Sequence, residues 1–508
     1  MNTFQDGLQF PKNPKTNKSS TTRVAKNILA AALHDLDSEL SQQIQQEPNW
    51  RRNYPKYFKE LVYFGLQSKQ NAVQIAKLGL NKAHQSFDFY RGHEKHAFHE
   101  IMALPRTVEL KTVCFQGENL DQAPQWYVPY QGKKLQGDDL IQQLNDWQQR
   151  GIIEPSHADA LKQVIAHPEW LDLSDRTMVL FGAASEAGPL TWLAKWKANI
   201  VAIDLPNEHV WQKILSTVQQ GNAKLYAPCA VEIEENASIE TLKTQLGANL
   251  LTQTPEIADW LMQRPENLDL AAIAYLDGEK HVRVALAMDY IMQYVSAKKA
   301  NTTLMFMCTP TDVYAVPRAV VEAVMEKYVQ RPLLQEKITK AVSFLSAKKF
   351  FAQNMQQFVQ GENEHYGIAD GLVLEQGPNY ALAKRLQQWR AIVAHQAGQR
   401  VSINIAPSTT THSVIKNPLL KAAFDGADLF DVEAFSPETT NALMAALWIY
   451  DLRSEDSVAN PQSVLKNPLE LIMHGANHGG LWRVPYLART ALPFAALYGF
   501  AKNKLKKR

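Results

Sequence analysis

Short apolar runs alternate along the chain with longer segments whose apolar residues recur at helical spacing. Five of the runs have the length and composition of buried strands and end at glycine, acidic, threonine or proline residues. These runs are residues 176–181, 199–204, 269–276, 302–308 and 399–407. Strands that alternate with helical segments are typical of α/β proteins. The pattern therefore predicts a doubly wound parallel sheet, Rossmann-like, over residues 171–485, with a helical insert at about 313–365 that contains helices at 319–328 and 333–360.

The chain before residue 171 divides into two regions. Residues 1–20 mix lysines with Asn, Ser, Thr and Pro and lack the apolar stretch of a signal peptide, so we expect them to be disordered and not to direct export. Residues 21–170 should form a largely helical region with a small mixed unit. That unit consists of a strand at 107–115, a candidate partner strand at 126–130, and helices at 137–149 and 156–167.

Composition narrows the class of protein. The chain has 508 residues, of which 45% are apolar, so it can bury a large core. Its 53 basic and 51 acidic residues nearly cancel, which argues against general nucleic-acid binding. The three cysteines, Cys114, Cys229 and Cys308, are far apart and odd in number. They favour free thiols in a reducing cytoplasm over a disulfide framework.

Two residues with acid–base chemistry stand four apart in a segment that reads as a helix opened by Gly377 and Pro378. They are Tyr380 and Lys384, and this spacing places phenol and ammonium on one helical face. A phenol titrates near pH 10, and a neighbouring ammonium lowers that pKa by favouring the phenolate. We therefore expect Tyr380 to exchange a proton with a carbonyl or alcohol near neutrality.

A glycine turn follows the first strand of the predicted sheet. Gly182 and Gly188 flank it, a helix is predicted at 191–197, and the second strand ends at Asp204. Small residues let the backbone approach a pyrophosphate, helix N–H groups face its charge, and the acid accepts from ribose hydroxyls. The order strand, turn, helix, strand, acid is that of a dinucleotide site.

Together these motifs make the chain resemble a divergent short-chain dehydrogenase/reductase. The family's turn has the form Thr-Gly-x-x-x-Gly-x-Gly. Gly182 and Gly188 match its first and third glycines, whereas Phe181 replaces the threonine and Glu186 the middle glycine. The run at 399–407, followed by Ser408 and three threonines, resembles the family's sixth strand and the turn after it, and the segment 435–440 before an apolar helix resembles the family's late helix.

The resemblance implies an NAD-dependent oxidoreductase, with NADP as the other cofactor, acting on a carbonyl or secondary alcohol. Tyr380 would be the general acid/base and Lys384 would lower its pKa and hold the ribose, while Thr309 or Thr311 would polarise the substrate oxygen. The residues implied to bind the dinucleotide are Gly182, Ser185, Gly188, Asp204, Asp277, Gly278, Pro407 and Thr409.

The family's usual spacing differs here, because about seventy residues separate Thr309 from Tyr380. The insert must therefore fold away from the sheet and return. Tyr314 and Arg318 form a second, lower-ranked pair four apart, since Pro317 interrupts a helix there and arginine does not titrate.

Two other functions stay open. A methyltransferase also has a glycine turn after its first strand and an acid after its second, and only the Tyr380 segment argues against that class. Glu186 and the missing family serine fit a non-catalytic nucleotide-binding scaffold. No metal site is predicted, because the cluster His93, His96 and His99 reads as a solvated helix end and the loop around His474 and His478 is rich in glycine.

Residues 486–508 form an apolar and aromatic segment with a basic end that is too interrupted to span a bilayer. Such an amphipathic tail fits an anionic membrane surface at the inner face of a membrane, and the alternative is that the segment packs on the protein. The insert repeats the pattern with the apolar residues Val342, Phe344, Leu345, Phe350 and Phe351 near Lys340, Lys348 and Lys349. The expected partners are thus a small-molecule or lipid substrate and a membrane surface; a homo-oligomer stays open.

Overall fold

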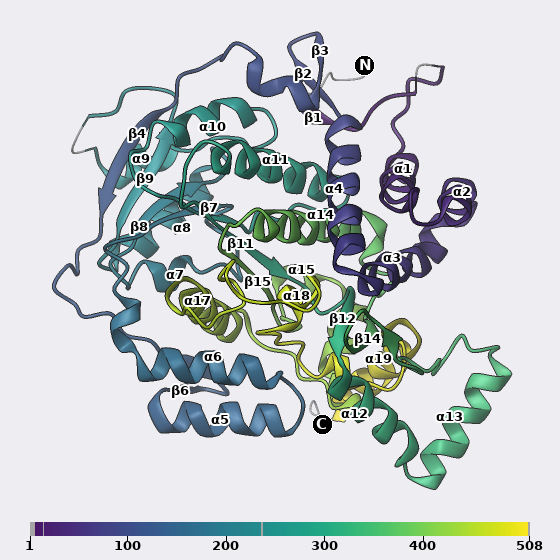
Figure 1. The fold of residues 1–508 in the computed structure, drawn as a ribbon. Coiled ribbons are helices and arrows are strands. Elements are labelled where there is room, and N and C mark those ends of the chain that lie inside the picture. Colours follow the sequence, from purple (N-terminus) through teal and green to yellow (C-terminus); the bar gives the residue numbers. More distant parts are fainter. Residues whose placement is uncertain (1–5, 14, 235–236, 506–508) are drawn as a thin grey trace.

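The computed structural model describes residues 6–13, 15–234 and 237–505. It is an α/β protein with a seven-stranded, mostly parallel central sheet (Figure 1). Across the sheet the strands are β15 (Val401–Ile405), β11 (Thr303–Cys308), β10 (Asp269–Ala272), β7 (Thr177–Phe181), β8 (Asn199–Ile203), β9 (Lys224–Cys229) and β4 (Lys111–Gln116). Neighbours pair in parallel except β4, which runs antiparallel to β9. The five predicted sheet strands are all present.

Alternate residues of the strands enter two different cores. Val179 and Phe181 of β7 face one core, while Met178 and Leu180 face the other, as expected for a sheet covered on both sides. Helices of the first core are α4 (Lys69–Gln85), α10 (Thr254–Met262), α11 (Glu279–Ser296) and α14 (Gly377–Gln396). Helices of the second are α5 (Gly137–Gln149), α6 (Pro155–Ala166), α8 (Glu208–Gln219), α9 (Ile239–Gln245) and α17 (Pro437–Arg453). Figure 1 shows α11 and α14 above the sheet and α17 and α6 below it.

The N-terminal helices add an outer layer to the first core. They are α1 (Thr21–Leu33), α2 (Ser38–Gln46) and α3 (Trp50–Gln67). A buried carboxylate connects three helices of the first core. Asp289 of α11 accepts two hydrogen bonds from Arg390 of α14, at 2.6 and 3.0 Å. The same carboxylate lies 2.6 Å from Nε2 of His84 in α4.

The prediction that residues 1–20 are disordered is wrong for the strand β1 (Gly7–Gln9). This strand pairs with β2 (Asp88–Arg91), which pairs in turn with β3 (Glu94–Ala97) before the short helix η1 (Phe98–Ala103). Leu8 and Phe10 are buried, because they pack into the first core. Residues 1–5 and 14 of that prediction lie outside the described residues.

The predicted small mixed unit is not separate from the sheet. Its first strand, expected at 107–115, is β4 and forms an edge of the central sheet. The expected partner at 126–130 instead forms β5 (Val128–Tyr130), which pairs with β6 (Lys133–Leu135) in a hairpin. The helices predicted at 137–149 and 156–167 are present as α5 and α6, followed by η2 (Pro168–Leu171).

The insert leaves the sheet and returns to the same place. It comprises β12 (Val313–Pro317), α12 (Arg318–Val329), α13 (Leu333–Leu345), β13 (Val359–Gln360) and β14 (His365–Asp370). β12 and β14 pair antiparallel, and the Gly371 N–H donates to the Asp312 carbonyl at 3.0 Å. The insert is thus helical only in part. The predicted helix 333–360 ends at Leu345.

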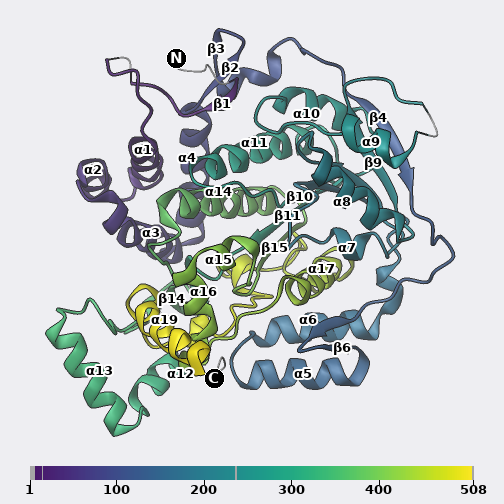
Figure 2. The ribbon, with the colours of Figure 1, turned by 180° about the vertical axis from the view of Figure 1, so that it is seen from behind.

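The C-terminal segments pack on the body. They are α15 (His412–Lys416), α16 (Pro418–Asp425), η3 (Ala427–Phe430), α18 (Glu470–Met473), η4 (Leu481–Arg483) and α19 (Ala488–Leu505). Figure 2 shows α19 beside α16, where small residues of both helices form a minor core. The expected tail is therefore a packed helix up to Leu505, and residues 506–508 of the basic end lie outside the described residues. Across the described ranges, no helix is both long and apolar enough to cross a bilayer.

A buried polar cluster ties the loop after α18 to α6. His478 Nε2 lies 2.9 Å from Glu154 Oε1, and Arg483 donates to the same oxygen at 2.6 Å. Nδ1 of His478 accepts from the Gly480 N–H at 3.1 Å, so the neutral ring donates through Nε2. Burial lowers the pKa of His478. These contacts give the histidine a structural role in the glycine-rich loop.

Candidate functional site

The carboxyl ends of the parallel strands meet at one edge of the sheet, and most of the predicted site residues lie there. This edge carries Gly182, Ser185 and Gly188 after β7, Asp204 after β8, Asp277 and Gly278 after β10, Thr309 and Thr311 after β11, and Pro407 and Thr409 after β15. Lys384 of α14 reaches the same edge, because its Nζ donates to the Met307 carbonyl in β11 at 2.9 Å. Gln387, one turn further along α14, donates to the Ala272 carbonyl of β10.

Tyr380 lies in an aromatic group at this edge. Its ring stacks on His281 with centroids 5.3 Å apart and an interplanar angle of 22°. Tyr275, exposed at the end of β10, packs against both rings, with centroids at 6.2 Å from Tyr380 and 4.8 Å from His281. The Lys384 Nζ is 6.0 Å from the centre of the Tyr380 ring. The helical spacing therefore does bring phenol and amine onto one face.

The expected lowering of the Tyr380 pKa is wrong in this structure. Burial raises the pKa of the phenol, and the nearby Thr309 hydroxyl offsets this only in part. Burial also lowers the pKa of Lys384, whose amine is already bonded to Met307 and Gln387. Both effects have one cause, because a low-dielectric surrounding disfavours each charged form. The phenol is thus protonated at neutral pH and suited to donate a proton.

The turn after β11 is held in place by its own hydroxyls. The Thr309 and Thr311 hydroxyl oxygens are 2.9 Å apart, and the Tyr314 hydroxyl donates to the Thr309 carbonyl at 2.6 Å. Tyr314 lies in a strand and is buried, whereas Arg318 pairs with Glu322 at the surface. The second pair is therefore not a proton-transfer pair on one helical face, and Tyr314 supports the turn that positions Thr309.

Gly182 lets the first turn touch the end of β10. Its φ is +87°, and a Cβ built there would be 2.5 Å from the Ala274 Cα. Asp204 fastens the same turn, because its carboxylate accepts from the Ala184 N–H and the Leu205 N–H, both at 2.9 Å. Burial raises the pKa of Asp204. The acid after β8 thus has a structural partner in the turn as well as its position near the expected ribose.

Two features of the turn depart from a pyrophosphate site. The helix predicted at 191–197 is only the single turn α7 (Leu190–Leu193), since the chain bends away to reach β8. Glu186 Oε2 accepts from the His412 N–H of α15 at 3.1 Å. A carboxylate therefore bridges the glycine turn and the loop after β15, where the family resemblance implies phosphate.

Most of the other residues implied to bind the dinucleotide form hydrogen bonds within the protein. The Thr409 hydroxyl donates to the Pro407 carbonyl at 2.9 Å and lies 2.8 Å from the Thr440 hydroxyl. Asp277 accepts from the Tyr275 hydroxyl at 3.1 Å, and Gly278 is the N-cap of α11. Ser185 and Gly188 close the first turn through a backbone hydrogen bond of 3.1 Å. These residues shape the edge, and Thr409 would have to exchange a partner to bind a ligand.

His281 also lies at this edge and was not predicted from the sequence. Its side chain is 1% exposed, and neither ring nitrogen has a hydrogen-bond partner among the described residues. Burial, together with the nearby Lys384, holds its pKa well below the ordinary value, so the ring is neutral. The available signal was its place in the first turn of α11, directly after Asp277 and Gly278, which points it to the strand ends.

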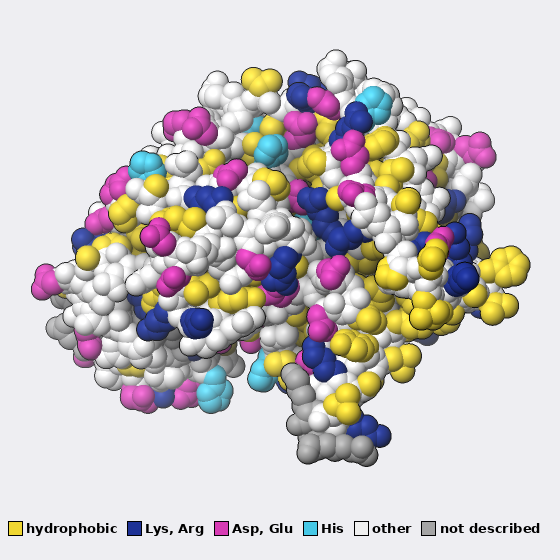
Figure 3. All heavy atoms as spheres, turned by 90° about the horizontal axis from the view of Figure 1, so that it is seen from below, with side chains coloured by type: hydrophobic (Ala, Val, Ile, Leu, Met, Phe, Trp, Pro, Cys, Tyr) yellow, Lys and Arg dark blue, Asp and Glu magenta, His cyan; other side chains and the backbone are white. Residues whose placement is uncertain are grey.

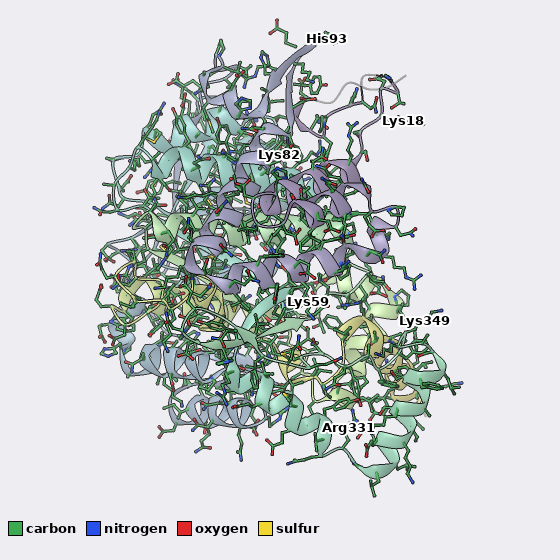
Figure 4. All side chains as sticks on the ribbon, turned by 45° about the vertical axis from the view of Figure 1, so that its right-hand side comes forward. Lys18, Lys59, Lys82, His93, Arg331 and Lys349 are labelled. Atoms are coloured by element: carbon green, nitrogen blue, oxygen red, sulfur yellow. The ribbon has the colours of Figure 1, made fainter. Side chains whose placement is uncertain are left out.

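The histidine cluster has another structure than expected. His93 lies in the turn of the β2–β3 hairpin, at the tip labelled in Figure 4, His96 in β3 and His99 in η1, so these side chains do not share a helix. In the described part of the chain no three His, Cys, Asp or Glu side chains gather as a metal site would need.

Comparison with protein-family models and with curated proteins found no match to this chain. The function is therefore inferred from the geometry of the sheet edge.

Proposed function

We propose that the protein is an NAD-dependent oxidoreductase that acts on a carbonyl or secondary alcohol. The strand order supports a Rossmann-like fold: β9, β8, β7, β10, β11 and β15 stand in the order 3-2-1-4-5-6 by their sequence in the parallel sheet. In such sheets ligands bind outside the carboxyl ends, where the order reverses between the first and fourth strands. Gly182 and Ala274 stand at that reversal.

The observation that carries the proposal is the placement of Tyr380, Lys384 and Thr309 at this edge. They come from α14 and from the end of β11, and only the return of the insert brings the two segments together. A phenol, an amine and a hydroxyl gathered beside a glycine turn can serve a reaction in which one oxygen gains or loses a proton.

The ribose and nicotinamide end of a dinucleotide fits this edge better than the pyrophosphate end does. The unpartnered nitrogens of His281 and the amine of Lys384 offer polar contacts to the ribose and nicotinamide. At the position of the pyrophosphate, Glu186 must release the His412 N–H before a phosphate can approach. When bound, a reduced nicotinamide supplies the hydride for a carbonyl carbon.

The residues of the chain supply the rest of the reaction. Thr309 donates a hydrogen bond to the substrate oxygen, and the protonated phenol of Tyr380 gives its proton to that oxygen as the alcohol forms. Lys384 then compensates the charge of the phenolate. His281, stacked on Tyr380, fixes the orientation of the ring.

A second candidate is a non-catalytic nucleotide-binding scaffold. The bond between Glu186 and the His412 N–H, together with the one-turn α7, favours it, because both weaken a grip on pyrophosphate.

The test is NADH consumption with a panel of short- to long-chain aldehydes and ketones. We expect turnover by the wild type, a loss of about 10²–10⁴-fold in Tyr380→Phe, and nearly unchanged NADH affinity. Tyr63→Phe is the matched control, because this tyrosine is exposed on α3 away from the sheet edge, and it should keep its turnover. Full activity of Tyr380→Phe would refute the assigned role, and NADH binding without turnover on any substrate would favour the scaffold.

A further inference from the structure

Helix α13 presents its apolar side outward. Five of its large apolar side chains are between 52% and 85% exposed, whereas the residue buried among the helix's described positions is Thr339. The exposed residues are Leu333, Leu334, Ile338, Phe344 and Leu345. A helix on a soluble surface normally buries such residues and exposes its polar ones. This orientation is therefore the reverse of ordinary packing.

The polar side of α13 faces the body across a hollow. Thr339 and Ser343 line a cavity of about 450 Å³ together with Tyr328, Phe351 and Tyr486, and Phe344, which is 85% exposed, also borders it. The helix thus stands away from the core, and Figure 1 shows it projecting from the molecule at the lower right. Nothing in the described chain covers the apolar side.

Basic residues surround the outward face. Residues 330–350 contain five basic side chains and one acid, which gives a net charge of +4 (five minus one). The exposed basic residues are Lys337, Lys340, Lys348 and Lys349. Arg331 is only 9% exposed and donates to the Tyr486 hydroxyl at 3.0 Å. The acid, Glu336, is paired with Lys340 at 2.5 Å. Figure 4 labels Arg331 and Lys349 at the two ends of this segment.

The face continues onto α19. Phe350 and Phe351 contact the ring of Phe494, with centroids at 5.4 and 4.2 Å. Beyond that contact α19 exposes Leu497, Tyr498, Phe500 and Leu505. In Figure 3, the view from below, hydrophobic side chains gather with Lys and Arg side chains at the right-hand end of the molecule, where Figure 1 places α13. Exposed apolar surface of this extent marks an interaction site.

We propose that α13 is a docking helix that lies in the surface of an anionic lipid bilayer. Its apolar side chains would enter the boundary between headgroups and acyl chains while the lysines at its flanks bind the headgroups. The charge excludes a second copy as the favoured occupant, because a two-fold contact would place +4 against +4. The proposal does not depend on the dinucleotide site.

The insert also connects this face to the candidate site. It leaves the sheet directly after Thr309 and Thr311 and returns through β14 to the helix that carries Tyr380. A bilayer bound by α13 would therefore lie on the element that joins the two halves of the proton-transfer group. The substrate class, unlike the docking of α13, rests on the proposed function: a lipidic carbonyl or alcohol is the substrate that such an arrangement serves.

The experiment is co-sedimentation of the full chain with vesicles of phosphatidylcholine alone or mixed with phosphatidylglycerol. We expect the wild type to sediment with the anionic vesicles and to be released by salt. The double variant Phe344→Ser/Leu345→Ser should bind at least tenfold more weakly. Val464→Ser is the matched control, since this side chain is 91% exposed elsewhere, and it should bind as the wild type does.

Three results would overturn the proposal: no sedimentation of the wild type, equal sedimentation of the double variant, or a wild-type dimer that the double variant turns into a monomer. Thermal melting checks that the double variant is folded. NADH titration of the same variant separates this proposal from the oxidoreductase, because a folded variant with intact NADH binding and lost vesicle binding supports α13 alone.

Discussion

Replacing Gly182 by alanine tests the close approach on which the candidate site depends. The new Cβ would be 2.5 Å from the Ala274 Cα and 2.8 Å from the Ala274 nitrogen, so backbone must move. The φ of +87° adds about 1–2 kcal/mol for a residue with a Cβ. Moving the backbone adds about 1–3 kcal/mol, as overpacking does in a core. We expect Gly182→Ala to lower the free energy of unfolding by about 2–5 kcal/mol.

Gly398→Ala is the matched control, because its φ is +89° and no atom lies within 4 Å of the Cβ built there. Its free energy of unfolding should fall only by the cost of a positive φ for a residue with a Cβ, about 1–2 kcal/mol. Urea unfolding measures both variants, and unchanged slopes make the midpoints comparable. Equal losses in the two variants would refute the contact between the first turn and the end of β10, and with it the geometry of the site.

Three further variants probe charged groups. Arg390→Met leaves the buried Asp289 carboxylate with only its imidazole partner, so the free energy of unfolding should fall by about 3–5 kcal/mol in chemical denaturation. An unchanged midpoint would show that this ion pair does not hold α11 and α14 together. Burial alone would raise the pKa of Glu154, yet the imidazole and guanidinium bonded to it hold that pKa below 4.5. Its stabilisation is therefore present above pH 4.5 and lost as the pH falls through the lower folded pKa, so the melting temperatures of wild type and Glu154→Gln should converge in acid. Asp204→Asn should weaken the preference for NADH over NADPH in titrations, because a carboxylate repels the extra phosphate; a preference that stays the same would remove that role.

The sheet was predictable because its strands are continuous apolar runs. The runs at 176–181 and 302–308 became β7 and β11, since strands buried on both faces need apolar side chains at every position. β9 was not predicted, because a lysine and a proline interrupt the apolar pattern of Lys224–Cys229. β12 and β14 were missed because their pairing spans the insert, and local pattern carries no signal for it.

The site was predictable in position and less so in chemistry. Spacing alone placed Tyr380 and Lys384 on one helical face, but burial sets the direction of both pKa shifts and is a property of the whole fold. The contact between Glu186 and His412 joins segments more than two hundred residues apart, so no local sequence motif predicts it. The same holds for the ring of His281 against Tyr380.

Calorimetric titration of NADH, NADPH and S-adenosylmethionine into the purified wild type measures whether the sheet edge binds a dinucleotide. We predict saturable NADH binding, weaker NADPH binding and no binding of S-adenosylmethionine. Glu186→Gly should bind NADH more tightly, because it frees the His412 N–H and removes a carboxylate from the turn. Binding of S-adenosylmethionine with no binding of NADH would rule out the proposed dinucleotide site and favour a methyltransferase.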